Sequence, residues 1–288
     1  MKSKVKYVIW NEVTTRTNLF SCGGCVALCV LFDFLKSLDA EVYLSHEIEQ
    51  SISGLKEYQD KDFFNNIKSP NLDEFIAIYP EVTIGNPLNC KKVVRWLLHS
   101  PDEIIQGSSQ FYEPSDTLIA METWVKEMSE EKGFKVADKL LKILHIDFDI
   151  FKNENQQRNG ICHIIKKGIA TNPEGLEGVD ITPFCNDPKA LAKIFNKSTT
   201  FYSYDDKTYL SVLAALCGCD SIVVNTESHS SDKYFDARAD FWKYGIAYGI
   251  NNLEHARNTK HLLKEELIKE KQKCLSSVKE FIHDTQPL

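Results

Sequence analysis

The sequence predicts an α/β protein of two domains, each built on a parallel sheet, with a cleft between the domains and C-terminal helices. Two sets of alternating strands and helices support this, one at the start of the chain and one after residue 160. Strands that alternate with helices in this way pair in parallel. The polar segment KNENQQRNG at 152–160 lies between the sets and is the best linker candidate. We therefore expect an N-terminal domain over 1–155 and a C-terminal domain over 156–288.

The composition is that of a folded protein whose main partner is not nucleic acid. Of 288 residues, 43% are hydrophobic and 11% are aromatic, enough for one large or two modest cores. The formal net charge is −7, whereas binding to a nucleic acid backbone normally needs a basic surface. No signal peptide is evident, and the longest apolar run, around CVALCVLF, is far shorter than the roughly 20 residues that span a bilayer.

The nine cysteines show no disulfide framework, which favours reduced thiols and a cytoplasmic location. Five of them invite a zinc interpretation: Cys22, Cys25, Cys29, Cys217 and Cys219. Structural zinc usually has two compact ligand pairs. Cys25 and Cys29 instead fall within a predicted helix, where cysteine behaves as a small apolar residue. We expect no metal and no other cofactor.

The first half of the chain opens with a strand, a glycine turn, a helix and a second strand. The first strand is VKYVIW (5–10) and the turn is SCGG (21–24). The helix is CVALCVLFDFLKSL (25–38) and the second strand is AEVYLS (40–45). After a polar stretch, DEFIAIYP predicts a strand that ends at Pro80. The next segment predicts a helix over 85–100, started by Pro87, with an apolar face of Val93, Val94, Leu97 and Leu98. Apolar elements follow at 116–124 and at 140–151, the second ambiguous between strand and helix.

The second half repeats the alternation. Strands are expected in ICHIIKKG, TTFYSY and SIVV. Four helices are expected: in DPKALAKIFNKS, from Thr208 to a stop at Gly218, over 236–250, and from about Asn252 to Ile282. The last helix carries an apolar stripe of Leu263, Leu267, Cys274, Val278 and Phe281. A helix packed along the protein explains this stripe better than a helix on a membrane surface.

Paired acids precede the helix that starts at Thr208. Asp205 or Asp206 could cap the helix by accepting from its unpaired backbone N–H groups. Alternatively, the N–H groups of residues 206–209 could face a ligand's phosphates, while an acid beside them accepts hydrogen bonds from sugar hydroxyls.

Other candidates lie where predicted strands end, the edge at which open parallel sheets bind ligands. Lys166 and Lys167 end a strand and could neutralise a diphosphate. Gly23 and Gly24 could satisfy a positive φ or let a substrate approach backbone amides. Glu81 could be a base or a hydroxyl-binding acid, although an exposed loop acid is the commoner explanation. None of the eight histidines has an evident partner in sequence; His163 in a strand and His99 at a helix end favour structural or surface roles.

Taken together, these segments resemble a GT-B glycosyltransferase, close to the retaining, nucleotide-sugar-dependent family 4-like and rhamnan-type polysaccharide transferases. SCGGCVALCVLFDFLKSLDAEVYL resembles the family's first glycine loop, helix and second strand, and YPEVTIGNPLNCKKVVRWLL its YPE…GNPL…VVRWLL segment. ICHIIKKG resembles the strand CYLIRKG, and YSYDDKTYLSVLAALCGCDSIVV resembles YSYD…T…S…EAALCGC…VV. Four such matches in order cover most of the chain.

The resemblance implies two Rossmann-like domains, a nucleotide-sugar donor held by the C-terminal domain and a glycan or lipid-linked glycan acceptor on the N-terminal one. It implies catalytic roles for Lys166 and Lys167 at the diphosphate and for Asp205 at the transferred sugar. It places Tyr204, Asp206, Lys207 and Thr208 at the donor, and Gly23, Gly24, Glu81 and Asn86 on the substrate side. No metal is required, and peripheral membrane contact is open.

Two departures from the family pattern leave alternatives open. The second acid of the E-x7-E motif, which holds the donor ribose, is Leu213 here, on the apolar face of its helix. Lys166 replaces an arginine and loses its bidentate fork. The leading hypothesis is a retaining, metal-independent glycosyltransferase that acts by front-face displacement. The alternatives are a non-catalytic GT-B-like binding subunit or a sugar-nucleotide epimerase.

Overall fold

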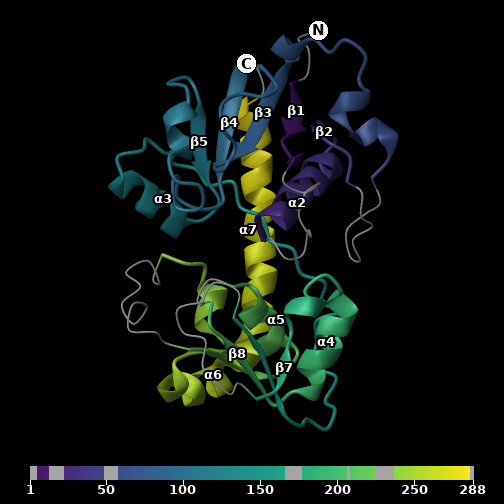
Figure 1. Ribbon diagram of the computed structural model, residues 1–288, viewed down its shortest axis with the longest axis vertical. Helices are drawn as coiled ribbons and strands as arrows, with labels where there is room; N and C mark the ends of the chain where they lie inside the picture. The colour runs from purple at the N-terminus through teal and green to yellow at the C-terminus, as the bar shows by residue number, and fades with distance from the viewer. Residues whose placement is uncertain are drawn as a thin grey trace. The chain divides into compact units, whose positions relative to one another are not determined.

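The computed structural model describes residues 5–12, 23–48, 58–165, 177–205, 208–224 and 237–285. The chain divides into two compact units, whose elements are labelled in Figure 1. Unit 1 comprises Met1–His145, Tyr234–Arg238 and Lys271–Leu288, and unit 2 comprises Ile146–Lys233 and Ala239–Glu270. The predicted α/β class with two parallel sheets is confirmed. The cleft between the domains stays a prediction.

The first change between units falls between residues 145 and 146, ten residues before the predicted boundary. The reason lies in the polar segment 152–160, which is bonded into unit 2. Arg158 Nη1 donates to the carbonyl oxygens of Phe195 (2.9 Å) and Ser198 (3.2 Å), at the end of a unit 2 helix. This segment is therefore part of unit 2 despite its linker-like composition.

Unit 1 contains a five-stranded parallel sheet in the order β2-β1-β3-β4-β5. The strands are β1 Lys6–Ile9, β2 Glu41–Leu44, β3 Phe75–Pro80, β4 Lys92–Leu97 and β5 Thr117–Ala120. The chain leaves β1 for β2 on one side and then crosses to β3 on the other. The strand order thus reverses between β1 and β3, and ligands of open α/β sheets bind beyond the carboxyl ends of strands at such a point.

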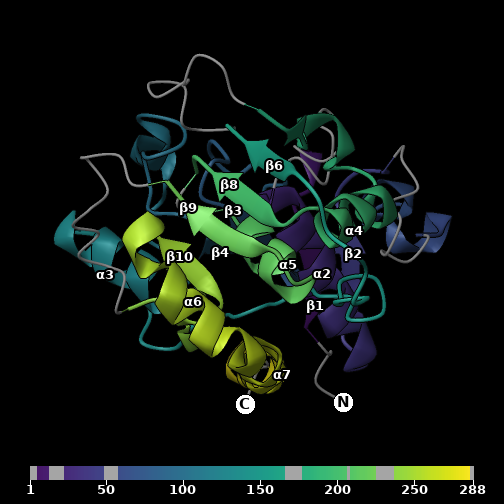
Figure 2. The same cartoon turned by 90° about the horizontal axis from the view of Figure 1, so that it is seen from below.

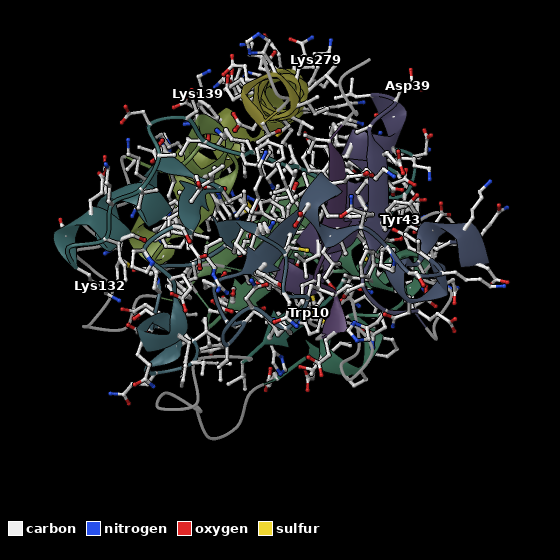
Figure 3. The ribbon with its side chains drawn as sticks, turned by 90° about the horizontal axis from the view of Figure 1, so that it is seen from above. Trp10, Asp39, Tyr43, Lys132, Lys139 and Lys279 are labelled. Carbon is white, nitrogen blue, oxygen red and sulfur yellow. The ribbon has the colours of Figure 1, made fainter. Side chains whose placement is uncertain are left out.

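One face of this sheet is covered by helix and the other by irregular chain. The helix α2, Gly23–Ser37, packs Leu28, Leu31 and Leu35 on the first face, together with Val278 and Phe281 of α7. Figure 3 shows Trp10 on the side of the sheet away from Lys279 of α7. On that second face Trp10 clusters with apolar side chains of 64–93. The remaining helices of unit 1 are α3 Thr123–Glu131 and the 3-10 turns Asp60–Asp62, Phe64–Asn66, Leu72–Glu74 and Ser108–Phe111.

The helix predicted over 85–100 is wrong, because residues 92–97 form β4 in the middle of the sheet. Val94 and Trp96 face the core beneath α2, whereas Val93 faces the second cluster. A strand buried on both faces has no polar alternation, so its apolar run fits a helical pattern equally well. Residues 140–147 form neither helix nor strand, which resolves most of the ambiguous segment.

Unit 2 repeats the topology of unit 1. Its parallel sheet has the order β10-β9-β8-β6-β7, so the first strand again lies between the second and the third. The strands are β6 Ile161–Ile164, β7 Val179–Asp180, β8 Thr200–Ser203, β9 Asp220–Val223 and β10 Ile246–Tyr248. Figure 2 shows β6, β8, β9 and β10 side by side, with α6 beside β10. The strand order therefore reverses between β6 and β8.

The helices of unit 2 follow the predicted alternation except over 236–250 and over 252–282, where the single predicted helix is divided by a 3-10 turn at Lys260–Leu262. They are α4 Pro188–Lys197, α5 Leu210–Leu216 and α6 Leu253–Thr259, with 3-10 turns at Thr182–Phe184, Asp240–Lys243, Ile250–Asn252 and Lys260–Leu262. Asp187 caps α4, since its Oδ1 accepts from the backbone N–H groups of Lys189 and Ala190, both at 3.0 Å. The helix predicted over 236–250 is wrong: a 3-10 turn and the short strand β10 occupy this stretch, where Gly245 and Gly249 have positive φ.

The helix α7, Leu263–Thr285, is the longest of the described elements. As its apolar stripe predicted, all five stripe residues are buried: Leu263 and Leu267 in unit 2, and Cys274, Val278 and Phe281 in unit 1. Within the described ranges, no helix combines the length and apolar character needed to cross a bilayer.

A buried arginine organises the irregular chain on the second face of the unit 1 sheet. Arg95 is fully buried, and its Nε donates to Asp116 at 2.7 Å. Its two terminal nitrogens donate to the carbonyl oxygens of Thr83 (3.0 Å) and Gly85 (2.6 Å). The guanidinium also lies 4.6 Å from the ring centre of Tyr112. Arg95 thereby supplies donors to loop carbonyls that helix hydrogen bonds would otherwise satisfy.

Replacing Arg95 by methionine should lower the free energy of unfolding by about 3–5 kcal/mol, because Asp116 would remain buried without its cation. Urea unfolding followed by circular dichroism measures this loss. Lys91→Met is the matched control: the Lys91–Asp73 pair is exposed, and its loss should cost less than about 1 kcal/mol. Equal effects of the two changes would contradict the organising role of Arg95.

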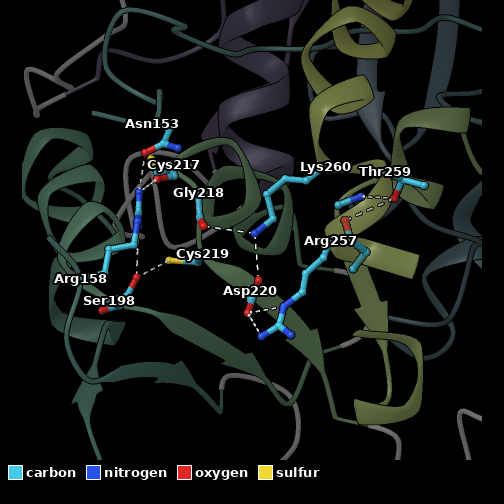
Figure 4. Close-up of polar contacts among 12 residues, drawn as sticks. Asn153, Arg158, Ser198, Cys217, Gly218, Cys219, Asp220, Arg257, Thr259 and Lys260 are labelled. Atoms are coloured by element: carbon cyan, nitrogen blue, oxygen red, sulfur yellow. Dashed lines mark hydrogen bonds and ion pairs between the residues drawn. The ribbon is translucent and has the colours of Figure 1, made fainter. Parts of the chain in front are cut away.

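A second charged cluster lies at the amino-terminal edge of the unit 2 sheet (Figure 4). Asp220, the first residue of β9, accepts from Arg257 Nε (2.9 Å) and Nη2 (2.6 Å) and from Lys260 (3.0 Å). Lys260 also donates to the carbonyl oxygen of Gly218 at 3.2 Å. Burial alone would raise the pKa of Asp220, but the hydrogen bonds from Arg257 and Lys260 outweigh it and hold that pKa below its usual value.

A lowered carboxyl pKa stabilises the fold above the unfolded value of about 3.9, and this stability is lost as the pH falls through the folded pKa. The free energy of unfolding of the wild type should therefore decrease as the pH falls below about 4. The Asp220→Asn variant should be less stable than the wild type at neutral pH, and its free energy of unfolding should decrease less when the pH is lowered. Thermal melts between pH 7 and pH 3 test this, with Asp240→Asn, in an exposed pair with Lys243, as the control. Parallel acid profiles of wild type and Asp220→Asn would contradict the assignment.

Candidate functional site

The carboxyl edge of the unit 2 sheet holds Tyr204 and Asp205, two of the predicted site residues. Tyr204 and Asp205 directly follow β8, beside β6, at the point where the strand order reverses. The backbone N–H of Tyr204 donates to the carbonyl oxygen of Ile164 at 3.0 Å and so extends the ladder by one residue. Asp205 comes next and is 5% exposed. The edge at which we expected a ligand is thus where this acid lies.

A serine fixes the turn that carries Asp205. The Ser203 hydroxyl donates to the carbonyl oxygen of Asp205 at 2.7 Å and accepts from its backbone N–H at 3.2 Å. Ser203 is itself fully buried. The backbone of Asp205 is therefore held relative to the sheet rather than left in a loose loop.

The helix after this turn begins later than predicted. Its first residue is Leu210 and its N-cap is Tyr209, without a side-chain cap. The prediction of Asp205 or Asp206 as the helix cap is therefore wrong, because the N-cap position is occupied by Tyr209. The helix α5 has only seven residues. Thr208 Oγ1 accepts from Leu210 N–H at 3.4 Å, so this hydroxyl points back to the helix start. Gly218 follows α5 with a φ of +99°, in agreement with the predicted stop.

Tyr204 is the remaining described residue of the predicted donor site. Burial, with nearby Tyr202 as the second cause, raises the pKa of Tyr204, so its hydroxyl keeps its proton at neutral pH. Lys166, Lys167, Asp206 and Lys207 lie outside the described residues. Their roles stay predictions.

Leu213 is a core residue. It is buried among Phe195, Phe201 and Ala214, beneath the sheet of unit 2. The prediction that Leu213 packs rather than binds is confirmed. A ribose-binding acid at this position would have to place a charge in this apolar cluster, where it lacks a partner.

Gly23 and Gly24 form the first turn of α2 rather than a turn before it. A Cβ atom added to Gly23 would meet no heavy atom of the described residues within 4 Å. Neither steric crowding nor a positive φ explains Gly23. Close approach of a ligand to its amide remains the interpretation that the sequence offered.

Glu81 and Asn86 have hydrogen bonds that shape the loop after β3. Glu81 is 5% exposed rather than an exposed loop acid, and its Oε2 accepts from the backbone N–H of Leu98 at 3.0 Å. Asn86 accepts from the Tyr79 hydroxyl and donates to the carbonyl oxygen of Cys90, both at 2.8 Å. These contacts give both side chains a structural role, and their part in substrate binding stays a prediction.

The carboxyl edge of the unit 1 sheet also carries polar side chains that the sequence did not single out. Asn11 follows β1, and Ser45 and His46 follow the neighbouring β2. Asn11 and Ser45 are fully buried and hydrogen-bonded to each other, whereas His46 is half-buried. Trp10 packs edge-on against the His46 ring, with ring centres 4.8 Å apart. A signal was present in Asn11 and His46, the residues that directly follow the strands predicted over 5–10 and 40–45.

Among the described residues, no three His, Cys, Asp or Glu side chains are grouped as metal ligands would be. Cys25 and Cys29 are buried in α2, and burial raises the pKa of the Cys29 thiol to about 12. The same cause raises the pKa of Cys217 to about 12. Cys25 and Cys29 thus pack as small apolar residues of α2, whereas Cys22 lies outside the described residues and the absence of a metal stays a prediction.

A cavity of about 520 Å³ lies in unit 1 at the opposite edge of its sheet. Its walls include Lys92 and Thr117, at the amino ends of β4 and β5, and Phe281 of α7. None of the predicted site residues that the structure describes lines this cavity. The described members of the predicted set instead follow the carboxyl ends of strands in the two sheets, and their joint role as a site stays a prediction.

Comparisons with known proteins show a likeness among solved structures. No protein-family model and no curated protein matches the chain. Among solved structures, the chain is similar to a mutant of BGT from T4 phage in complex with UDP-glucose. The identity is 10% and the TM-score 0.48, over 96% of this chain and 98% of that chain.

Leu213→Ala should lower the free energy of unfolding by about 2–5 kcal/mol, because it leaves a cavity in the unit 2 core. Leu210→Ala on the same helix, at a half-buried position, should cost clearly less. Chemical denaturation of both variants measures the difference. If Leu213→Ala left stability unchanged but weakened ligand binding, the packing role would be refuted.

Proposed function

We propose that the chain is a glycosyltransferase that moves a sugar from a nucleotide-diphosphate donor to a hydroxyl of a glycan or lipid-linked glycan, with retention of configuration. One observation carries the proposal. Two parallel sheets share one strand order, and the YSYD stretch of the resemblance, Tyr202–Asp205, ends beside the point where the order of the second sheet reverses. A ligand of an open α/β sheet is expected at that edge.

Unit 2 is the proposed donor side. Asp205, held by Ser203 at the end of β8, accepts hydrogen bonds from hydroxyls of the transferred sugar. Lys166 and Lys167 neutralise the diphosphate, together with amides around residues 206–208, and no metal is needed. Tyr204 and Thr208 line the same edge.

Unit 1 is the proposed acceptor side. An acceptor approaches the first amides of α2 at Gly23, whose missing Cβ atom would meet no heavy atom of the described residues within 4 Å. Glu81 and Asn86 act mainly by fixing the loop after β3. In the proposed front-face displacement the sugar–phosphate bond breaks as the lysines stabilise the leaving diphosphate, and the acceptor hydroxyl attacks from the same side. The leaving phosphate then takes the hydroxyl proton.

Leu213 favours a second candidate function, a non-catalytic binding subunit with the same fold. Its burial in the unit 2 core means that the ribose-binding acid of the resemblance has no counterpart at this position. Such a subunit could keep sugar recognition at Asp205 without turnover. An epimerase has less support, because it needs an acid–base pair around the sugar.

Binding and turnover of UDP-, GDP- and dTDP-sugars separate these functions. Isothermal titration measures binding, and release of nucleoside diphosphate with and without glycan acceptors measures turnover. Transfer supports the proposal, and binding without turnover supports the binding subunit. No binding to any of these sugars would reject the transferase.

Lys167→Ala should reduce turnover by roughly 100-fold or more, because charge on the leaving diphosphate would lose its stabilising cation. Lys193→Ala, at an exposed position of α4 in the same unit, is the matched control and should leave turnover unchanged. Steady-state kinetics with the best donor of the panel gives both values. Turnover of Lys167→Ala equal to that of the control would remove Lys167 from the site.

A further inference from the structure

His46 lies in a hydrogen-bond network that joins the ends of two neighbouring strands. The pairing of β1 with β2 aligns Ile9 with Leu44, and the Ser45 N–H donates to the Ile9 carbonyl oxygen at 2.9 Å. Asn11 and His46 each stand two residues beyond these strand ends. Both therefore lie at the carboxyl edge of the sheet, beside the point where its strand order reverses.

The backbone of His46 fixes the orientation of the Asn11 amide. The His46 N–H donates to Asn11 Oδ1 at 2.7 Å, and the His46 carbonyl oxygen accepts from Asn11 Nδ2 at 2.6 Å. A backbone N–H only donates and a carbonyl oxygen only accepts. The two ends of the amide therefore cannot be exchanged, and Oδ1 is an acceptor.

The Ser45 hydroxyl then determines which nitrogen of His46 carries the proton. Ser45 Oγ donates its single hydrogen to Asn11 Oδ1 at 2.8 Å and accepts from the Asn11 N–H at 2.9 Å. Its 2.8 Å contact with His46 Nδ1 needs a hydrogen, which only Nδ1 can supply. The neutral ring thus carries its proton on Nδ1, and Nε2 is the basic nitrogen.

We propose that His46 is a catalytic base whose Nε2 accepts the proton of the acceptor hydroxyl. The inference rests on the proposed function and changes one element of it, since His46 rather than the leaving phosphate takes this proton. The hydroxyl oxygen forms the bond to the anomeric carbon, the O–H bond breaks toward Nε2, and the nucleoside diphosphate leaves with the electron pair of the broken sugar–phosphate bond. Trp10, packed edge-on at 84° to the ring, and buried Ser45 hold the imidazole in place.

His99 offers a matched comparison in the same sheet. It also stands two residues beyond a strand, β4, and packs edge-on against a tryptophan, Trp124, at 5.2 Å. Its Nδ1, however, accepts from the backbone N–H of Ser100 at 2.9 Å. In the neutral ring the proton is therefore on Nε2, and this nitrogen cannot act as a base.

The test compares His46→Gln with His99→Gln in the full chain. His46→Gln should lower kcat by about 100- to 10,000-fold, the usual contribution of a general base, with unchanged nucleotide-sugar affinity. His99→Gln should keep wild-type kcat, and Ser45→Ala should lower kcat less than His46→Gln does. Thermal melts establish that each variant folds. Wild-type kcat in a folded His46→Gln variant would overturn the inference while the proposed function stands.

A second measurement does not depend on turnover. Nitrogen chemical shifts of ¹⁵N-labelled histidine at pH 8 should show the proton of His46 on Nδ1 and that of His99 on Nε2. Ser45→Ala should remove the preference at His46. A proton on Nε2 of wild-type His46 would overturn the inference even in an active transferase. A chain that binds no nucleotide sugar overturns the proposed function and this inference together.

Discussion

The arrangement of unit 1 depends on a buried guanidinium. A parallel sheet needs cover on both faces, and connecting helices normally supply it with their own hydrogen bonds already made. Here α2 and α7 cover one face, whereas the connection from β3 to β4 crosses the other face as a loop. Loop carbonyls at the core need donors from elsewhere. Arg95 provides them while Asp116 balances its charge, so the loop is ordered by a polar interaction at its centre.

This constraint reaches the carboxyl edge of the sheet. Thr83 and Gly85, which Arg95 binds, lie between Glu81 and Asn86 in the chain. Glu81 bonds to Leu98 beyond the end of β4, so the connections after β3 and β4 are tied to one another. The acid that sequence patterns offered as a ligand group thus contributes to the rigidity of the edge. Preorganised edges of this kind reduce the ordering cost when a ligand binds.

The sequence predicted the strands wherever an apolar run was bounded by turn residues, as for β3, β6 and β8. It failed at β4, whose burial on both faces removes the alternation that distinguishes strand from helix. It failed again at 236–250, where positive φ at glycines breaks an apparently helical pattern. Asp205 was placed correctly at a strand end, because that position follows from local order alone. His46 was missed because its partner Asn11 is 35 residues away, and only the register of β1 with β2 brings them together.

Unit 2 separates groups that stabilise the fold from groups that could react. The charges that tie its strands and helices together, Asp220 with Arg257 and Lys260, lie where β9 begins. Asp205 lies where β8 ends, at the opposite edge of the same sheet. Parallel strands impose this division, because all their amino ends share one edge and all their carboxyl ends the other. The ion pairs that hold β9 to the helices after it therefore lie apart from Asp205, and a change of side chain at the carboxyl edge leaves them in place.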